Sequence, residues 1–148
     1  MSSDLRGARR HSREVALQVL FAMDLHAKKT GEQPAAQEAF DDVGSNFEMP
    51  ESNRAFAKEL VCGVAEHLDA LDNVLRDAAK NWRVERMAVV DRNVLRLSAF
   101  ELAHTETPVE VVIDEAVRMA KRFGDDPSSG FVNGVLDAVA RNLRGETR

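Results

Sequence analysis

Three arginines near the N-terminus are the residues best suited to a chemical role. Arg9, Arg10 and Arg13 are spaced so that a helix beginning there carries them on one side. Guanidinium groups arranged in this way can hold successive phosphates of a single RNA strand and stack on its bases. The dipole of a helix disfavours arginine in its first turn, which indicates a binding role for the cluster. The alternative is a solvated basic tail that only aids solubility.

A second candidate lies at the start of the last apolar segment. Asp126 is the expected N-cap of a helix and Pro127 its first residue, followed by the small residues Ser128, Ser129 and Gly130. Free N–H groups at such a helix start donate hydrogen bonds to phosphate oxygens. Phe131 follows within the first turn and could stack on a base or enter the core; its spacing alone slightly favours the core.

The sequence offers little for catalysis or metal binding. The four histidines are widely separated, and no nucleophile elbow, P-loop or G-x-G-x-x-G motif occurs. Paired acids such as Asp125-Asp126 are expected to be caps or solvated faces. Cys62 lies in an apolar segment and is expected to be a buried structural thiol. We therefore expect no enzyme activity, no cofactor and no metal site.

The distribution of charge along the chain supports a site that binds a polyanion, although the net charge does not. The formal net charge of −5 argues against a nucleic-acid partner. Residues 1–13, however, hold four arginines and one aspartate, a local charge of +3, which leaves −8 on the remaining residues. No apolar run approaches the roughly 20 residues needed to cross a bilayer. Because the N-terminus also lacks a signal-like apolar stretch, we expect a cytoplasmic protein.

Helical periodicity recurs along almost the whole chain and must position these residues. The 148 residues, 44% of them hydrophobic and 30% charged, are typical of a globular protein. Prolines and glycines fall almost entirely between the periodic segments. The pattern predicts an all-α fold of six or seven helices joined by short links. The expected helices cover about 12–28, 34–46, 52–71, 71–82, 91–104, 109–123 and 127–143, with Asp91 an N-cap and Gly124 a C-terminal cap.

Several motifs in these segments resemble one known family. They are Asp91-Arg92-Asn93-Val94-Leu95-Arg96-Leu97, Glu101-Leu102, Pro108-Val109, Ile113-Asp114-Glu115-Ala116, Ala120-Lys121-Arg122-Phe123-Gly124 and Phe131-Val132-Asn133-Gly134-Val135-Leu136. In this order and spacing they resemble the NusB family of bacterial transcription antitermination factors. The stretch from Arg9 to Glu14 is similar to the arginine-rich first helix of that family. The resemblance covers nearly the whole chain, and residues 30–55 match least.

The resemblance implies a non-enzymatic factor with one RNA-binding domain over residues 1–148. Its two three-helix halves, about 8–80 and 81–144, would pack with an extra helix around a shared core. The factor would bind single-stranded boxA RNA of ribosomal RNA leaders together with NusE, a small-subunit ribosomal protein, and then join NusA, NusG and RNA polymerase. By position, the RNA-contacting residues would be Arg9, Arg10, Arg13 and Phe131, and the NusE-facing residues Phe21 and Glu101. Pro127 and Gly130 depart from the acidic and basic residues usual in that turn of the family.

Two other functions stay open at this stage. One is a helical protein-interaction adaptor that binds no RNA and whose basic head only steers partners electrostatically. The other is a stand-alone relative of the helical RNA-binding domain found before ribosomal-RNA cytosine methyltransferases. Because no cofactor-binding domain follows before Arg148, we do not expect methyl transfer by this chain alone. The sequence is compatible with either a monomer or a homodimer.

Overall fold

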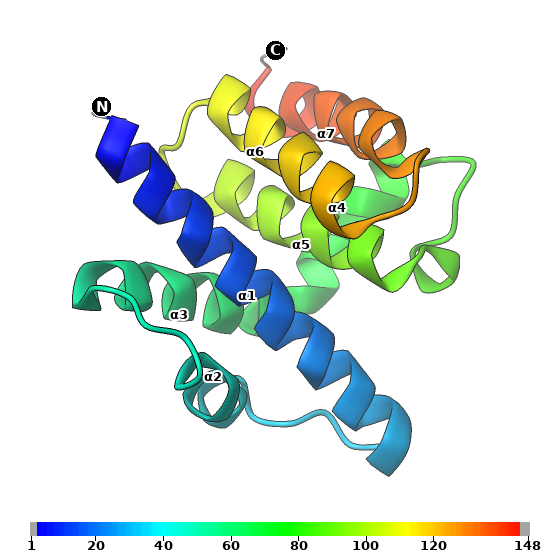
Figure 1. Ribbon diagram of the computed structural model, residues 1–148. Helices are drawn as coiled ribbons and strands as arrows, with labels where there is room; N and C mark the ends of the chain where they lie inside the picture. The colour runs from blue at the N-terminus through cyan, green and yellow to red at the C-terminus, as the bar shows by residue number, and fades with distance from the viewer. Residues whose placement is uncertain (1–2, 146–148) are drawn as a thin grey trace. The chain divides into compact units, whose positions relative to one another are not determined.

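Helices make up most of the chain that the structure describes. A computed structural model describes residues 3–145, with side chains from residue 7 onward, so the side chains of Asp4 and Arg6 in the basic head lie outside it. Over this range the secondary structure is all-helical, which confirms the predicted fold class (Figure 1). The elements are α1 (Ser3–Thr30), α2 (Ala36–Gly44), α3 (Glu51–Glu66), α4 (Leu68–Ala78), the 3-10 helix η1 (Val84–Arg86), α5 (Val89–His104), α6 (Val109–Phe123) and α7 (Ser128–Arg144).

The first helix begins earlier than its sequence pattern predicts. Helix α1 already starts at Ser3, so Arg9 and Arg10 lie beyond its first turn and the helix dipole does not oppose them. The Ser12 hydroxyl, expected near the helix start, instead donates to the carbonyl oxygens of Asn53, at 2.9 Å, and of Ala8, at 3.2 Å. The predicted conflict between the arginines and the dipole was therefore wrong.

Two other helix starts also differ from the prediction. Helix α5 begins at Val89 with Ala88 as its N-cap, so Asp91 lies in the first turn, where its charge favours the dipole. Helix α7 begins at Ser128, and Pro127 rather than Asp126 occupies the N-cap position. The Ser128 hydroxyl accepts a hydrogen bond from the backbone N–H of Asp125 at 3.1 Å. That bond closes the turn before α7 but does not cap the helix, because no side chain accepts from its first N–H groups and the predicted Asp126 cap is absent.

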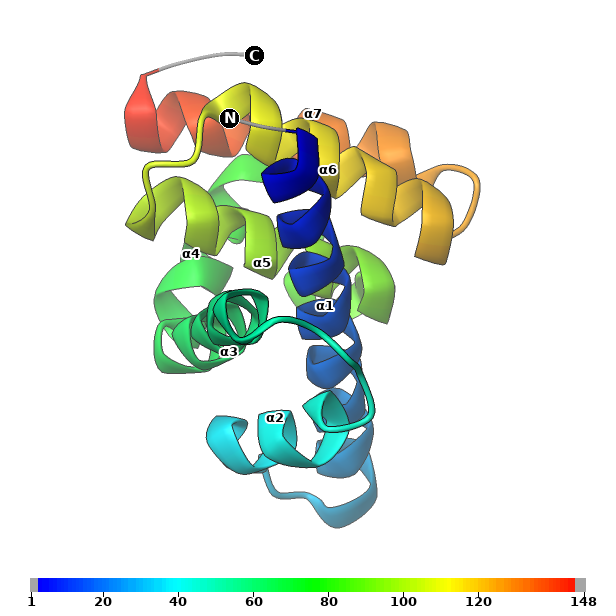
Figure 2. The same cartoon turned by 60° about the vertical axis from the view of Figure 1, so that its left-hand side comes forward.

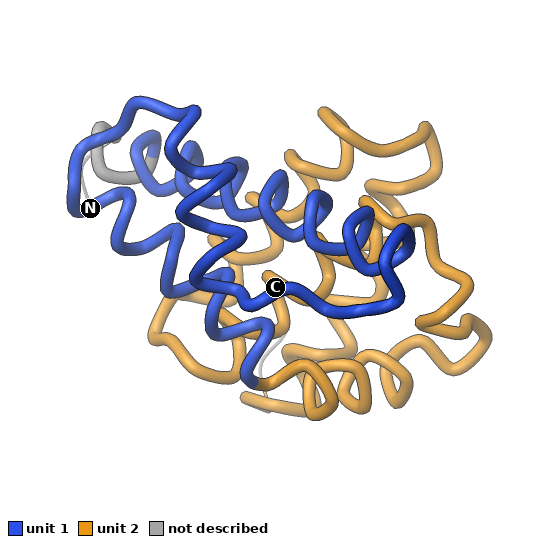
Figure 3. Tube along the Cα trace, turned by 90° about the horizontal axis from the view of Figure 1, so that it is seen from below, with its two compact units in different colours: residues 1–66 blue, residues 67–148 orange. Residues whose placement is uncertain are grey.

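The chain divides into two compact units, residues 1–66 and residues 67–148 (Figure 3). The division falls earlier than the boundary near residue 80 expected from the sequence, because α4 packs with α5 and α7. The expectation that both units share one core, and so form a single domain, stays a prediction.

In the first unit, α1, α2 and α3 pack against one another pairwise. Figure 2 shows α2 beside the C-terminal half of α1. Apolar residues at three- and four-residue intervals bury one stripe of each helix. The buried stripe of α1 comprises Val15, Ala16, Val19, Leu20 and Met23, and that of α3 Phe56, Ala57, Leu60, Val61 and Val64.

In the second unit, α5 packs against α4, α6 and α7. Its central place agrees with the small number of polar positions in its sequence. The buried residues of α5 run almost continuously from Asn93 to Leu102, whereas α6 and α7 each bury a single stripe. None of the helices between residues 3 and 145 is long and apolar enough to span a membrane.

Arginines from later helices complete the C-terminal ends of two earlier ones. The Arg54 guanidinium of α3 donates to the carbonyl oxygens of Gly44, at 3.0 Å, and Phe47, at 2.6 Å, where α2 ends. Arg144 at the end of α7 likewise donates to carbonyl oxygens at the end of α5 and in the loop after it. Its guanidinium donates to the carbonyl oxygens of Glu101, Leu102, Thr105 and Thr107 at 2.7–3.2 Å. Cations satisfy helix C-terminal carbonyls and favour the helix dipole there.

Candidate nucleic-acid interface

The arginine cluster of α1 is held over an aromatic ring of α3. The guanidinium carbon of Arg9 lies 4.5 Å from the centroid of the Phe56 ring, and that of Arg13 lies 5.6 Å from it. Both distances are within the range of a cation–π interaction. Nearby, the rings of His11 and Phe47 meet edge-on, with their centroids 6.5 Å apart. The two contacts with Phe56 orient the side chains of Arg9 and Arg13 before any ligand binds.

The three arginines differ in their access to solvent. Arg9 and Arg10 are half-buried, whereas only 2% of Arg13 is exposed. A guanidinium that is already buried cannot reach a phosphate without leaving its place. The structure therefore presents Arg9 and Arg10 at the surface and uses Arg13 in the packing beneath them. Sequence spacing alone could not separate the three.

The predicted aromatic residue of the second unit has a partner that sequence reasoning missed. Phe131, in the first turn of α7, is half-buried, and its ring meets Trp82 edge to face with centroids 5.3 Å apart. Trp82 lies between α4 and η1 and is 61% exposed. The available signal is a tryptophan followed by arginine at a break in the helical pattern, where the sequence predicts a helix end.

The turn before α7 offers less to a phosphate than its sequence suggests. The backbone N–H of Ser128, the first of α7, is taken by the carbonyl oxygen of Asp125 at 2.9 Å, and the Ser128 side chain is buried. Asp125 and Asp126 are exposed and place negative charge at this end of the helix. Phe131 is therefore the residue of this region best suited to contact a base.

The two residues expected to face a protein partner lie in different surroundings. Phe21 on α1 is 46% exposed, and Leu25 one turn later is exposed to the same extent. Glu101 on α5 is 2% exposed, and its carboxylate accepts a hydrogen bond from the Thr107 hydroxyl at 3.3 Å. Phe21 is thus available for contact, whereas Glu101 holds the loop after α5. A partner-binding role for either residue stays a prediction.

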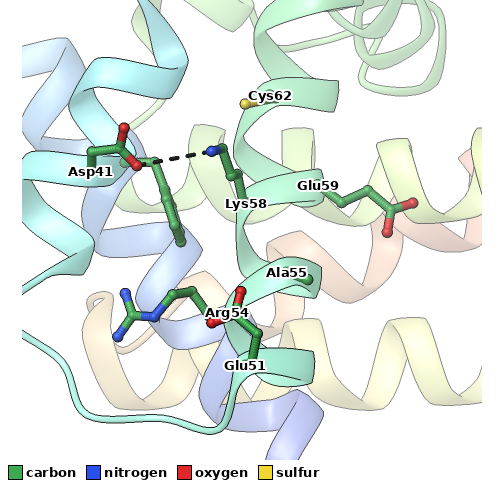
Figure 4. A pocket seen from close by; sticks show the side chains of 8 residues that line it. Asp41, Glu51, Arg54, Ala55, Lys58, Glu59 and Cys62 are labelled. Carbon is green, nitrogen blue, oxygen red and sulfur yellow. Dashed lines mark ion pairs between the residues drawn. The ribbon is translucent and has the colours of Figure 1, made fainter.

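A pocket between α2 and α3 carries no reactive arrangement (Figure 4). The Lys58 ammonium lies 3.9 Å from the Asp41 carboxylate, and the Arg54 guanidinium is bound to backbone carbonyl oxygens. Cys62 is half-buried rather than fully buried as predicted. Burial raises the pKa of its thiol, which keeps it protonated and poorly nucleophilic at neutral pH.

The histidines do not assemble a metal centre. The His67 and His104 rings stack with centroids 4.2 Å apart, and the His67 ring also stacks on Phe100 at 6.2 Å. Within the described part of the chain, no group of three or more His, Cys, Asp or Glu side chains is placed to hold a metal ion.

The all-helical fold and its arginine-bearing and aromatic surfaces are typical of the class of small helical nucleic-acid-binding proteins. The sequence profile of the NusB family matches residues 10–141. The chain belongs to the NusB family, a family of non-enzymatic transcription antitermination factors.

Curated and solved relatives agree with this assignment. The transcription antitermination protein NusB of Sorangium cellulosum (strain So ce56) is 50% identical over 142 residues, covering 93% of this chain and 94% of the relative. The solved structure of T. maritima NusB superposes with a TM-score of 0.78 at 32% identity, covering 90% of each chain. A crystal structure of antitermination factors NusB and NusE in complex with dsRNA contains a chain with a TM-score of 0.76 and 29% identity, covering 91% of this chain and 97% of that one.

Proposed function

We propose that this protein is a transcription antitermination factor that binds single-stranded boxA-type RNA of ribosomal RNA leaders together with NusE. The observation that carries the proposal is the arginine cluster of α1, in which the Arg9 guanidinium lies over Phe56 and both Arg9 and Arg10 reach the surface. Arginine presented in this way binds phosphate oxygens through charge-assisted hydrogen bonds. The crystallised complex of NusB, NusE and dsRNA from a relative supports both an RNA and a NusE partner.

The proposed roles of the candidate residues follow their exposure. Arg9 and Arg10 contact RNA phosphates, while Arg13 positions α1 through its contact with Phe56. Phe131 supplies an aromatic contact to the RNA from the second unit. Phe21 contributes a contact to NusE from the first unit, and Glu101 contributes in the second unit by holding the loop after α5.

The proposed assembly extends to NusA, NusG and RNA polymerase and operates in the cytoplasm, where bacterial transcription takes place. The free protein is a monomer or a homodimer in this proposal. Sedimentation of the purified chain, alone and with RNA, distinguishes the two states. If a dimer dissociates when RNA is added, the RNA site overlaps the contact between copies.

The decisive experiment measures RNA affinity across a salt series with two matched double variants. Arg9→Ala/Arg10→Ala removes the proposed phosphate contacts, whereas Lys28→Ala/Lys29→Ala removes two exposed cations from the last turn of the same helix. Each phosphate contact contributes about −0.7 to the slope of log affinity against log salt. The arginine variant should therefore make the slope less negative by about 1.4, and the lysine variant should leave it unchanged.

Two outcomes contradict the proposal. Equal losses in the arginine and lysine variants would show non-specific charge attraction in place of a site. NusE binding without any gain in RNA affinity on forming the complex would favour a protein-interaction adaptor. The adaptor remains a second candidate because Phe21 and Leu25 expose adjacent apolar surface on α1.

A further inference from the structure

The most exposed large apolar side chain of the described residues is Trp82, at 61%. Tryptophan is usually well buried because removing its large apolar surface from water is strongly favourable. Here its ring rests edge to face on half-buried Phe131 while one side of the indole stays open to water. Aromatic side chains, tryptophan among them, are enriched at interfaces relative to the rest of a protein's surface.

The segment around Trp82 is well fixed, so the indole is already in place before binding. The backbone N–H of Trp82 donates to the carbonyl oxygen of Ala79 at 2.9 Å. Val84 is 1% exposed, and Met87 is also buried. These side chains, at the first residue of η1 and directly after it, anchor the segment. A fixed aromatic residue loses little conformational entropy when a ligand stacks on it.

The charges beside Trp82 favour an anionic partner. Lys80, Arg83 and Arg86 are all exposed. The one acidic residue among them, Glu85, is bound by Arg76 from α4, with the guanidinium nitrogen 2.8 Å from the carboxylate oxygen. The segment is therefore locally positive in a chain whose net charge is −5. An aromatic side chain among cations is the combination that single-stranded nucleic acids require, for stacking and for phosphate contacts.

We infer that Trp82 is a base-stacking residue for an unpaired RNA nucleotide. Phe131 holds the indole edge-on, and Arg83 and Arg86 lie beside it for the flanking phosphates. The exposed acids Asp125 and Asp126 supply no cation in the turn before Phe131, so the cations of the Trp82 segment are the ones proposed to hold the phosphates beside the stacked base. This inference rests on the proposed RNA-binding function and extends it to residues that the family resemblance did not mark.

The chain provides its own probe of this contact. Trp82 is its single tryptophan, and the chain contains no tyrosine, so the intrinsic fluorescence reports on this one indole. The full-length protein is titrated with a single-stranded boxA-type oligoribonucleotide and, separately, with the same sequence annealed to its complement. Stacking on a base quenches indole emission. We expect the single strand to quench the Trp82 fluorescence at the same RNA concentrations at which a labelled RNA shows binding. The duplex should leave the Trp82 fluorescence unchanged.

Substitutions separate stacking from simple packing. Trp82→Leu keeps apolar volume but cannot stack, and it should weaken single-strand affinity by about 5- to 150-fold. Trp82→Phe should restore most of that loss. Leu143→Ala, at another exposed apolar position, is the matched control and should leave affinity unchanged. Thermal unfolding of each variant identifies any loss of folding, and Trp82→Phe keeps the comparison valid if Trp82→Leu is unstable.

The outcomes distinguish this inference from the function on which it rests. If the RNA binds in an Arg9- and Arg10-dependent manner while Trp82 fluorescence and Trp82→Leu affinity do not change, the stacking role is overturned and the RNA-binding function stands. If the wild-type chain binds no RNA, alone or with NusE, both are overturned. Quenching by NusE in the absence of RNA would make Trp82 a protein contact and would also overturn the inference.

Discussion

At the scale of single residues, two arginines that contact the same phenyl ring differ in their exposure to solvent. Arg9 and Arg13 both approach Phe56, yet Arg9 keeps access to solvent and Arg13 does not. A buried guanidinium contributes through its cation–π contact and the packing of its apolar stem. An accessible one can also bind a phosphate. The same residue type therefore has different effects on stability and on RNA binding.

Substituting the two arginines should show this difference directly. Arg13→Ala should lower the free energy of unfolding by about 1–2 kcal/mol, because it removes a buried contact with Phe56. It should leave the salt slope of RNA binding unchanged. Arg9→Ala should make that slope less negative by about 0.7. Urea unfolding and RNA binding at several salt concentrations measure both effects, and a changed slope in Arg13→Ala would contradict the assignment.

At the scale of elements, helix ends are completed by residues from elsewhere in the chain. Arg144 provides the clearest case, because its guanidinium reaches four carbonyl oxygens at and beyond the end of α5. Carbonyls at a helix end generally lack partners within their own helix, although that of Glu101 also accepts from the N–H and the hydroxyl of Thr105. The last residue of α7 thus holds the loop that leads from α5 into α6.

Removing that guanidinium should destabilise the protein. Arg144→Met keeps the apolar stem but leaves the α5 carbonyls without their donors, and we expect a loss of about 1–3 kcal/mol in the free energy of unfolding. Arg141→Met, an exposed cation in the same last turn, is the control and should cost no more than about 0.5 kcal/mol. Similar losses in both variants in urea unfolding would show that Arg144 acts only through its charge.

The junction between α6 and α7 depends on a glycine for steric reasons. A Cβ at Gly124 would lie 2.7 Å from the Ser128 hydroxyl and 2.8 Å from the carbonyl oxygen of Ala120. The second contact is with backbone and cannot be relieved by rotating a side chain. At Gly134, inside α7, a Cβ would meet nothing within 4 Å.

Alanine at these two glycines should therefore have opposite effects. Gly124→Ala should destabilise the protein by about 1–3 kcal/mol, because overpacking forces the turn to shift. Gly134→Ala should stabilise it by about 0.5–1 kcal/mol, because alanine favours the helix and no atom is displaced. Thermal unfolding of the two variants tests both signs. A stabilised Gly124→Ala variant would mean that the turn relaxes without cost.

At the scale of the whole molecule, the protein consists of two compact units of modest size. Small units bury a smaller fraction of their surface on folding and are marginally stable alone. Each unit also presents its own candidate RNA contacts, the arginine cluster in one and the Trp82–Phe131 pair in the other. We expect the two units to depend on each other for stability, as a single domain does.

Unfolding followed by two signals tests this expectation. Trp82 fluorescence reports on the second unit alone, whereas helical circular dichroism reports on all helices. One domain should give coincident urea transitions by both signals. A fluorescence transition displaced from that of circular dichroism would show that the units unfold separately.

Much of this architecture is determined by local sequence. Helix formation depends on hydrogen bonds and apolar spacing within a few residues, so the all-α class and the buried stripes of α3, α6 and α7 follow from periodicity. The arginine-rich start and the absence of catalytic motifs are equally local features. Helix starts were less predictable, because Ser12 and Ser128 form bonds outside the patterns expected of them.

The exposure of the candidate site residues was decided only by the tertiary structure. Arg13 and Arg9 have the same chemistry and both approach Phe56 of α3, yet only Arg13 is buried. Glu101 lies in a recognisable motif but is buried against the loop after α5. Trp82 follows a helix end, and its ring contacts Phe131 while most of the side chain stays exposed. Each outcome depends on neighbours distant in sequence, and burial by such neighbours leaves no periodic signal in the residues themselves.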